Sequence, residues 1–224
     1  MVFERFMRLL APLVVLLSLP VLGSAQTGRS PEELAKALQE RYQSVRDFTA
    51  DFVQTYRGGV LRTETRERGT VTVKKPGLMR WIYTNPERKE FVSDGLKMYS
   101  YIPEDRQVVV SNVPTDSEAP TPVLFLAGKG NLVRDFTASQ AESPVAGSIA
   151  VKLTPRRKEP EYEYLIVAVD PATLQIRALT TRDRQGGEST LRFENLKENK
   201  GISDKDFAFR IPRGVDVITN GQRN

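Results

Sequence analysis

Three side chains that can line a site for an apolar molecule recur at every second position between Leu78 and Tyr83. They are Met79, Trp81 and Tyr83, and Trp81 is the only tryptophan of the chain. A period of two is the spacing of residues on one face of a β-strand. Such a face either packs into a core or lines a cavity that receives an apolar guest. The spacing alone leaves both interpretations open.

The residue types that the chain lacks limit the reactions it can perform. It contains no histidine and no cysteine, which excludes Ser-His-Asp and Cys-His nucleophilic sites, histidine-ligated zinc and imidazole acid–base catalysis. A hydrolase with two carboxylates remains an alternative, but candidates such as Asp94 and Glu104 have no pattern that pairs them. We therefore expect a protein that is not an enzyme and that uses no metal and no cofactor.

The net charge of +5 raises the question of a polyanionic partner. Basic and acidic residues alternate from Arg62 to Arg68, and the cluster from Arg156 to Lys158 is followed at once by glutamates. This mixture favours an ordinary solvated surface over a nucleic-acid site.

The first 25 residues have the pattern of a signal peptide. Arg5 and Arg8 precede an apolar stretch from Leu9 to Leu22, and small residues follow it up to Ala25. This pattern predicts cleavage after Ala25 and export of the mature chain. The remaining residues, 26–224, have a length that suits a single domain.

The mature part begins with a helix and continues mainly as β-strands. Ser30, Pro31 and Glu33 form a helix start with a capping box. Apolar residues then recur at helical spacing, at Leu34, Leu38, Tyr42 and Val45. Strand patterns follow at residues 49–56, 67–74, 78–83, 89–93, 97–102, 107–111, 132–138, 148–154, 162–169, 176–182, 188–196 and 207–209. Many strands at hairpin spacing predict one curved antiparallel sheet or an open barrel.

Two further segments interrupt or end this pattern. Thr121 and Pro122 precede a short apolar stretch, which predicts a short helix that covers the sheet. Residues Gly214 to Ile218 are expected to close an edge of the sheet.

Several strings of residues, spread over nearly the whole mature chain, match one known family. They are F-T-A-D-F-V-Q (48–54), G-T-V-T-V-K-K-P-G-L-M-R-W (69–81), V-S-D-G (92–95) with Tyr99, T-P-V-L-F-L (121–126) and F-A-F-R-I-P-R-G-V-D-V-I (207–218). Because these strings occur in this order behind a signal peptide, the chain resembles the periplasmic outer-membrane lipoprotein carrier family (LolA). The resemblance implies a mainly β fold, an incomplete (unclosed) antiparallel β-barrel covered by a lid of short helices, with an apolar cavity inside.

The function that this resemblance implies is transport. Family members take up the acyl chains of lipoproteins released by an inner-membrane ABC transporter and carry them to an outer-membrane lipoprotein acceptor. We expect a monomer that acts as a chaperone in outer-membrane biogenesis and binds no nucleic acid. The alternative within the same architecture is a domain that senses lipid or lipoprotein and signals to a membrane partner.

The resemblance also assigns residues to the site. The expected lining of the acyl cavity comprises Met79, Trp81, Tyr83, Phe91, Met98, Leu124, Phe125 and Leu126. Phe48 and Phe52 are expected to pack the first strand under the helix. Lys75 stands where the family often has arginine, which is implied to hold the lid closed; lysine keeps the charge but loses the planar set of donors. An ordinary exposed turn lysine is the alternative.

Overall fold

The computed structural model describes residues 28–58, 63–113, 125–128 and 130–220. The predicted signal peptide and its cleavage site lie outside these residues, as does Leu124. Among the described residues, no helix has the length and hydropathy that crossing a membrane requires.

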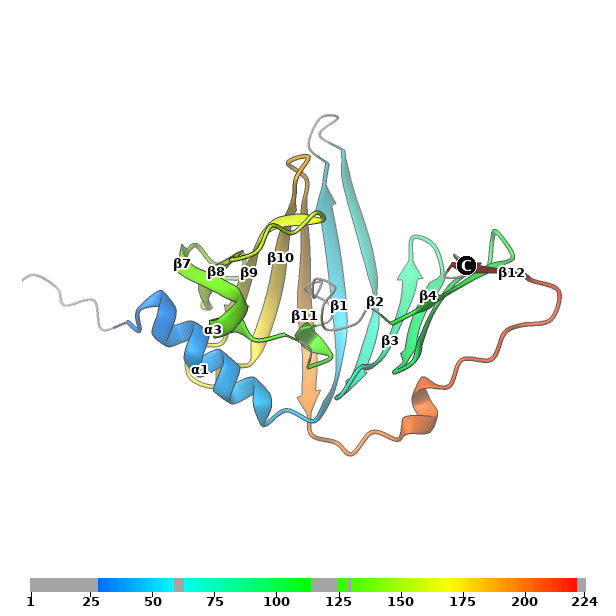
Figure 1. The fold of residues 1–224 in the computed structure, drawn as a ribbon, viewed down its shortest axis with the longest axis horizontal. Helices are drawn as coiled ribbons and strands as arrows, with labels where there is room; N and C mark the ends of the chain where they lie inside the picture. The colour runs from blue at the N-terminus through cyan, green and yellow to red at the C-terminus, as the bar shows by residue number, and fades with distance from the viewer. Residues whose placement is uncertain (1–27, 59–62, 114–124, 129, 221–224) are drawn as a thin grey trace, which may run out of the picture.

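Twelve strands of the described chain form one sheet (Figure 1). Its order is β12-β6-β5-β4-β3-β2-β1-β11-β10-β9-β8-β7. The strands are β1 (Asp47–Arg57), β2 (Glu64–Lys74), β3 (Leu78–Asn85), β4 (Lys89–Asp94), β5 (Lys97–Ile102), β6 (Gln107–Asn112), β7 (Phe136–Ala141), β8 (Ile149–Pro155), β9 (Tyr162–Val169), β10 (Ile176–Asp183), β11 (Glu188–Glu198) and β12 (Asp216–Asn220). Because β12 and β7 are the two ends of this order, the sheet stays open, as predicted.

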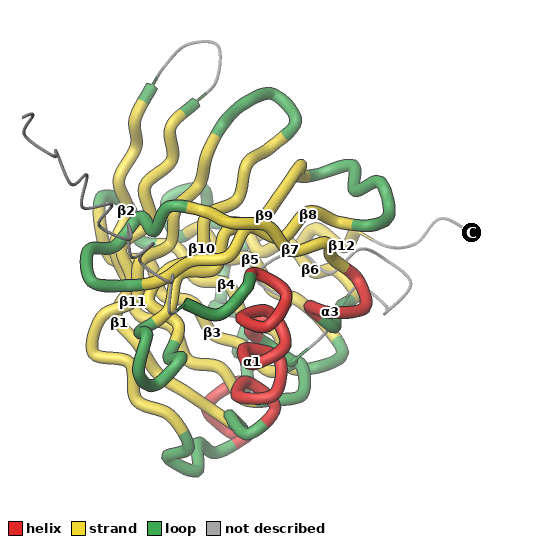
Figure 2. The backbone as a smooth tube through the Cα atoms, turned by 90° about the vertical axis from the view of Figure 1, so that its left-hand side faces the viewer, coloured by secondary structure: helices red, strands yellow, loops and turns green. Residues whose placement is uncertain are grey.

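The helix α1 (Pro31–Gln43) begins as its sequence predicts. The Ser30 side chain accepts a hydrogen bond from the Glu33 backbone N–H, and the Glu33 carboxylate accepts one from the Ser30 N–H. Leu34, Leu38 and Tyr42 are buried on the side that faces the sheet. Figure 2 shows α1 beside the short helix α3 (Leu132–Asp135), and both pack near β7. We call the face of the sheet under α1 the inner face.

Two segments predicted as strands have other structures. Residues 132–138 begin as α3, because the Asn131 side chain accepts hydrogen bonds from the N–H groups of Val133 and Arg134. Only from Phe136 onward does the chain join the sheet, as β7. The predicted strand at 207–209 is also wrong: Phe207 ends the 3₁₀ helix η1 (Asp204–Phe207), whose first turn the Ser203 side chain caps.

The C-terminal segment, residues 199–220, is coloured orange to red in Figure 1. It packs on the outer face of the strands β3 to β6. Phe207 is buried there, and the ring of Phe209 stacks on Tyr99 with 5.0 Å between centroids. Arg80 donates to the carbonyl of Ala208 at 2.8 Å. The segment ends as β12, which pairs with β6 and thereby covers that edge as predicted, although the pairing is parallel. The C-terminal segment therefore supports the strands β3 to β6 from the outer face of the sheet.

Gly69 in β2 allows the centre of the sheet to pack. It is buried and lies between Phe52 of β1 and Tyr83 of β3 in the strand register. A Cβ atom at this position would lie 2.0 Å from the carbonyl oxygen of Ile82 and 2.8 Å from the ring of Phe52. Since the first of these atoms belongs to the backbone, a side chain here requires the strands to shift.

Gly69→Ala is therefore expected to lower the free energy of unfolding by about 2–3 kcal/mol, because the added methyl overpacks the sheet. Urea unfolding followed by circular dichroism measures the change. Thr70→Ala, at the exposed neighbouring position, is the control and should change stability by less than about 0.5 kcal/mol. Equal stability of the two variants would contradict this account of Gly69.

Candidate functional site

Five of the predicted lining residues lie together on the inner face. Trp81 of β3 is directly opposite Phe91 of β4, and Met79 shares a cross-strand row with Met98 of β5 through Ser93. Tyr83 follows Trp81 at the next inward position of β3. Met79 and Trp81 are buried, whereas Tyr83, Phe91 and Met98 are partly exposed. The alternation read from the sequence thus gives one apolar surface across three neighbouring strands.

An aromatic cluster joins this surface to the centre of the sheet. The ring of Phe52 makes edge contacts with Trp81 and with Tyr83, at centroid distances of 5.2 and 4.9 Å. Tyr83 makes a similar contact with Phe91 at 5.6 Å. Phe52 was predicted only to pack the first strand; it is buried there, and it also supports the rings of the predicted lining. Edge-to-face contacts of this kind fix ring positions without polar atoms.

The segment Phe125–Gly128, which we call the cover segment, lies against α1 and the turn between β2 and β3. Phe125 and Leu126 are helical and buried, as the sequence predicts, whereas Leu124 falls outside the described residues. The Tyr42 hydroxyl donates to the carbonyl of Leu126 at 2.7 Å, and its ring stacks on Phe125 at 4.8 Å. The N–H of Gly77 donates to the carbonyl of Ala127 at 3.0 Å. Within the described part of the chain, these two hydrogen bonds join the segment to α1 and to the β2–β3 turn.

Lys75 lies at the point where α1, the cover segment and the β2–β3 turn meet. Its ammonium group donates to the carbonyl of Tyr42 and lies 3.4 Å from the centroid of the Tyr42 ring. Its side chain passes Gly128 so closely that a Cβ atom there would be 2.9 Å from Cδ of Lys75. Burial lowers the pKa of Lys75 to about 8. The negative charge of Glu198 opposes this lowering of the pKa, and the positive charge of Arg41 adds to it. The side chain is not an ordinary exposed turn lysine.

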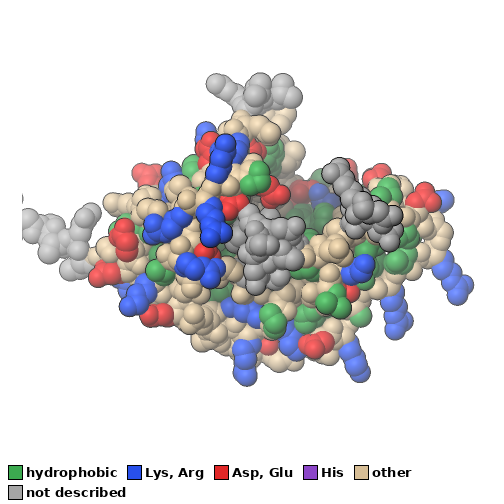
Figure 3. Space-filling model, in the orientation of Figure 1, with side chains coloured by type: hydrophobic (Ala, Val, Ile, Leu, Met, Phe, Trp, Pro, Cys, Tyr) green, Lys and Arg blue, Asp and Glu red, His purple; other side chains and the backbone are tan. Residues whose placement is uncertain are grey.

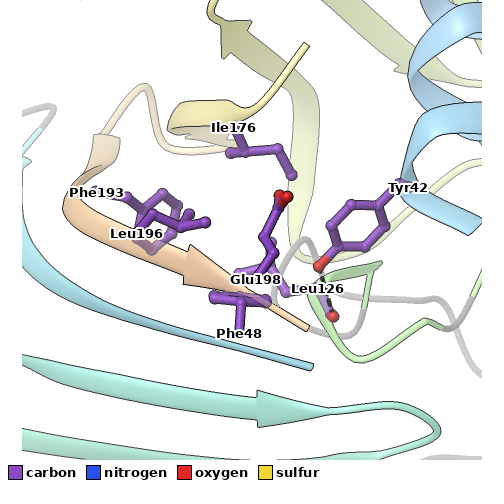
Figure 4. A pocket seen from close by; sticks show the side chains of 7 residues that line it. All are labelled: Tyr42, Phe48, Leu126, Ile176, Phe193, Leu196 and Glu198. Atoms are coloured by element: carbon purple, nitrogen blue, oxygen red, sulfur yellow. Dashed lines mark hydrogen bonds between the residues drawn. The ribbon is translucent and has the colours of Figure 1, made fainter. Parts of the chain in front are cut away.

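A small cavity adjoins this junction (Figure 4). It is lined by Tyr42, Phe48, Leu126, Ile176, Phe193, Leu196 and Glu198, and its volume is about 10 Å³. That volume holds about one water molecule. The Glu198 carboxylate pairs with Arg41 of α1. Burial, and next the charge of Glu198, raises the pKa of Tyr42 above its ordinary value.

Tyr42, Arg41 and Glu198 were not predicted as site residues. Tyr42 was read only as part of the apolar stripe of α1, and its hydroxyl gives no signal of its own in the sequence. Arg41 and Glu198 are 157 positions apart in the sequence. They meet because the end of α1 lies beside the end of β11. No local spacing could have revealed this pair.

A polar group borders the apolar surface at its other end. The Tyr83 hydroxyl donates to the side-chain carbonyl of Gln54 at 2.7 Å. The ammonium of Lys89 pairs with Glu67 and lies 4.8 Å from the Tyr83 ring centroid. Burial, and next the charge of Glu67, raises the pKa of Tyr83. We call Gln54, Glu67, Tyr83 and Lys89 the polar border.

Charges of both signs mix over the surface, as the sequence indicates. Figure 3 shows Lys and Arg side chains next to Asp and Glu over most of one face. It also shows a recess in which hydrophobic side chains are visible. The described residues contain no group of three or more acidic side chains placed to hold a metal ion.

Comparison with known proteins identifies the family of this chain. The family model described as "Outer membrane lipoprotein carrier protein LolA" matches residues 43–210. The chain belongs to this family. An outer-membrane lipoprotein carrier protein of Chromohalobacter salexigens is 32% identical to this LolA-family chain, covering 92% of it and 93% of the relative. One of Hahella chejuensis is 31% identical, covering 81% of the chain and 86% of the relative.

A solved structure shows the same fold. An uncharacterised conserved protein of Thermus thermophilus aligns with this LolA-family chain at a TM-score of 0.53 and 12% identity. The alignment covers 83% of this chain and 99% of the solved one.

The lowered pKa of Lys75 predicts how stability changes with pH. Between about pH 8 and about pH 10 the unfolded chain binds a proton at Lys75 that the folded chain has released. The stability of the wild type relative to Lys75→Met should therefore rise over this interval and stay constant between pH 6 and about pH 7. Urea unfolding of both proteins at each pH measures this difference.

The exposed Lys97 provides a matched control. The wild type compared with Lys97→Met should show no such rise. A constant difference between the wild type and Lys75→Met up to pH 10 would mean that Lys75 is not desolvated in the folded protein.

Proposed function

We propose that this protein is a periplasmic chaperone that carries acylated lipoproteins from the inner membrane to an acceptor in the outer membrane. Membership in the LolA family supports this function. The observation that carries it is the apolar surface on the inner face of β3, β4 and β5, formed by Met79, Trp81, Phe91 and Met98. It lies in a sheet that does not close, beside the cover segment, to which Tyr42 and Gly77 donate hydrogen bonds.

The energetics of carriage agree with this arrangement. Each methylene group removed from water contributes about 0.8 kcal/mol, so an acyl chain against the inner face would be held strongly. The cavity beside Leu126 of the cover segment holds about one water molecule, so an acyl chain would enter that cavity only if the cover moved. Closure of the empty protein then competes with the guest and limits its affinity. This competition makes release to an acceptor possible.

The proposal extends to the partners and the processing of the chain. An inner-membrane ABC transporter would deliver the lipoprotein, and an outer-membrane lipoprotein would accept it. Residues 1–25 would be removed after Ala25, and residues 26–224 would act as a single domain and a monomer, without catalysing a reaction. Depletion of the protein in its host should leave outer-membrane lipoproteins at the inner membrane, which membrane fractionation detects. Their normal arrival at the outer membrane would refute the proposal.

Met98→Asp is expected to weaken the binding of a triacylated lipopeptide at least tenfold. The new carboxylate would have to lose water where the acyl chain lies. Displacement of a fluorescent fatty acid measures the affinity. Lys97→Asp places the same carboxylate at the exposed position next to it and should bind like the wild type. Equal loss in both variants would show that charge alone, and not the inner face, determines binding.

Lys75→Leu is expected to slow the transfer of lipoprotein from loaded carrier to acceptor. Without the bond to the Tyr42 carbonyl the closed state is weaker, so it competes less with the guest and release is slower. Transfer to acceptor-containing vesicles measures the rate. Lys75→Arg keeps the charge and the donors and serves as the control. If Lys75→Leu transfers as fast as the wild type, Lys75 does not fasten the cover.

A further inference from the structure

The indole N–H of Trp81 is buried, and no described residue accepts a hydrogen bond from it. The side chain is only 5% exposed, and Nε1 has neither solvent contact nor an acceptor. An unsatisfied buried donor costs about 1–3 kcal/mol, and buried tryptophans usually have a partner for this group. The other two such atoms among the described residues, Arg80 Nε and Glu90 Oε1, belong to an ion pair on the outer face, whereas the indole of Trp81 takes part in no ion pair.

The neighbours of Trp81 on the inner face offer it no acceptor. Val71 and Phe91 lie directly opposite it on the adjacent strands, and the ring of Phe52 meets it edge to face. The nearest hydroxyl on its own strand, that of Tyr83, donates to Gln54 and makes no hydrogen bond with the indole N–H. Among the described residues no group supplies an acceptor, which leaves this donor available to a molecule bound on the inner face.

A guest with an acyl ester supplies such an acceptor in the right chemical context. The ester carbonyl is the strong acceptor nearest to the apolar tail, and it stands at the boundary between that tail and the polar head. Trp81 likewise stands between an apolar and a polar part of β3. Met79 lies two residues before it among apolar side chains, and Tyr83 of the polar border lies two residues after it. Two residues of a strand span about 7 Å.

We propose that the Trp81 indole N–H donates to an ester carbonyl of the bound lipoprotein's glyceryl-linked acyl chains. This inference depends on the proposed function and adds a recognition element to it. The acyl tail then lies along Met79 toward the cover segment, and the glyceryl head lies against the polar border. The bond forms only in the loaded state, and a guest without a carbonyl leaves the donor unpaired, which penalises its binding.

Nuclear magnetic resonance tests this bond directly, because Trp81 is the only tryptophan. Protein labelled with ¹⁵N-tryptophan gives a single indole signal. The probes are a synthetic peptide with a dipalmitoyl-glyceryl cysteine and its dialkyl ether analogue, which lacks both ester carbonyls. The ester peptide should move the indole proton signal downfield, and the ether analogue should not. The ester peptide should also bind about 3- to 10-fold more tightly.

Variants separate the indole from the rest of the site. Trp81→Phe keeps an aromatic ring and should bind both peptides with equal affinity. Tyr101→Phe removes a hydroxyl on the outer face, where the Tyr101 ring lies beside Phe209, and should keep the preference for the ester. If Trp81→Phe does not fold, the wild-type signals alone decide the question.

The outcomes distinguish this inference from the proposed function. If both peptides bind the wild type equally and move the indole signal alike, acyl carriage stands and the role of Trp81 is wrong. If neither peptide binds, the proposed function and the role of Trp81 fail together.

Discussion

The constraint on which the structure depends is that its sheet does not close. In the strand order β12 and β7 stand at opposite ends, so the apolar inner face has no second sheet to cover it. Non-sheet elements do this instead: α1 and α3 lie over the β7 side, and the cover segment lies at the β2–β3 turn. A sheet closed on itself would hide the same residues permanently. An open one leaves their burial to elements that can move without breaking a strand ladder.

Tyr42 connects these elements. Its backbone carbonyl accepts from Lys75, its hydroxyl donates to the carbonyl of Leu126 and its ring stacks on Phe125, so one residue of α1 touches both the turn and the cover segment. The pair of Arg41 with Glu198 anchors the same end of α1 to β11. The cover segment is thereby tied to a helix that is itself anchored to the sheet, and the contacts that join the segment to this helix lie within a small region.

The sequence predicts the strands and the helix start well because these depend on neighbours in the chain. The alternation of Met79, Trp81 and Tyr83 and the capping box of Ser30 and Glu33 are local patterns, and both appear in the structure. It fails at residues 132–138, where the cap made by Asn131 outweighs an apolar pattern, and at Phe207, whose burial comes from packing on an outer face. The partners of Lys75 and the unpaired state of Trp81 depend on strands and helices far apart in the chain. Spacing carries no information about them.

The C-terminal segment has a mechanical consequence for the half of the sheet that carries the apolar surface. Lys74 donates to the carbonyl of Ile202, Arg80 to that of Ala208, and β12 pairs with β6, so this segment crosses the outer side of β3 to β6 and is bonded at both ends. It braces these strands from their outer side, where it opposes their flattening. The mechanical support of the apolar surface therefore comes from the opposite face of the sheet, and it does not depend on the elements that cover the inner face.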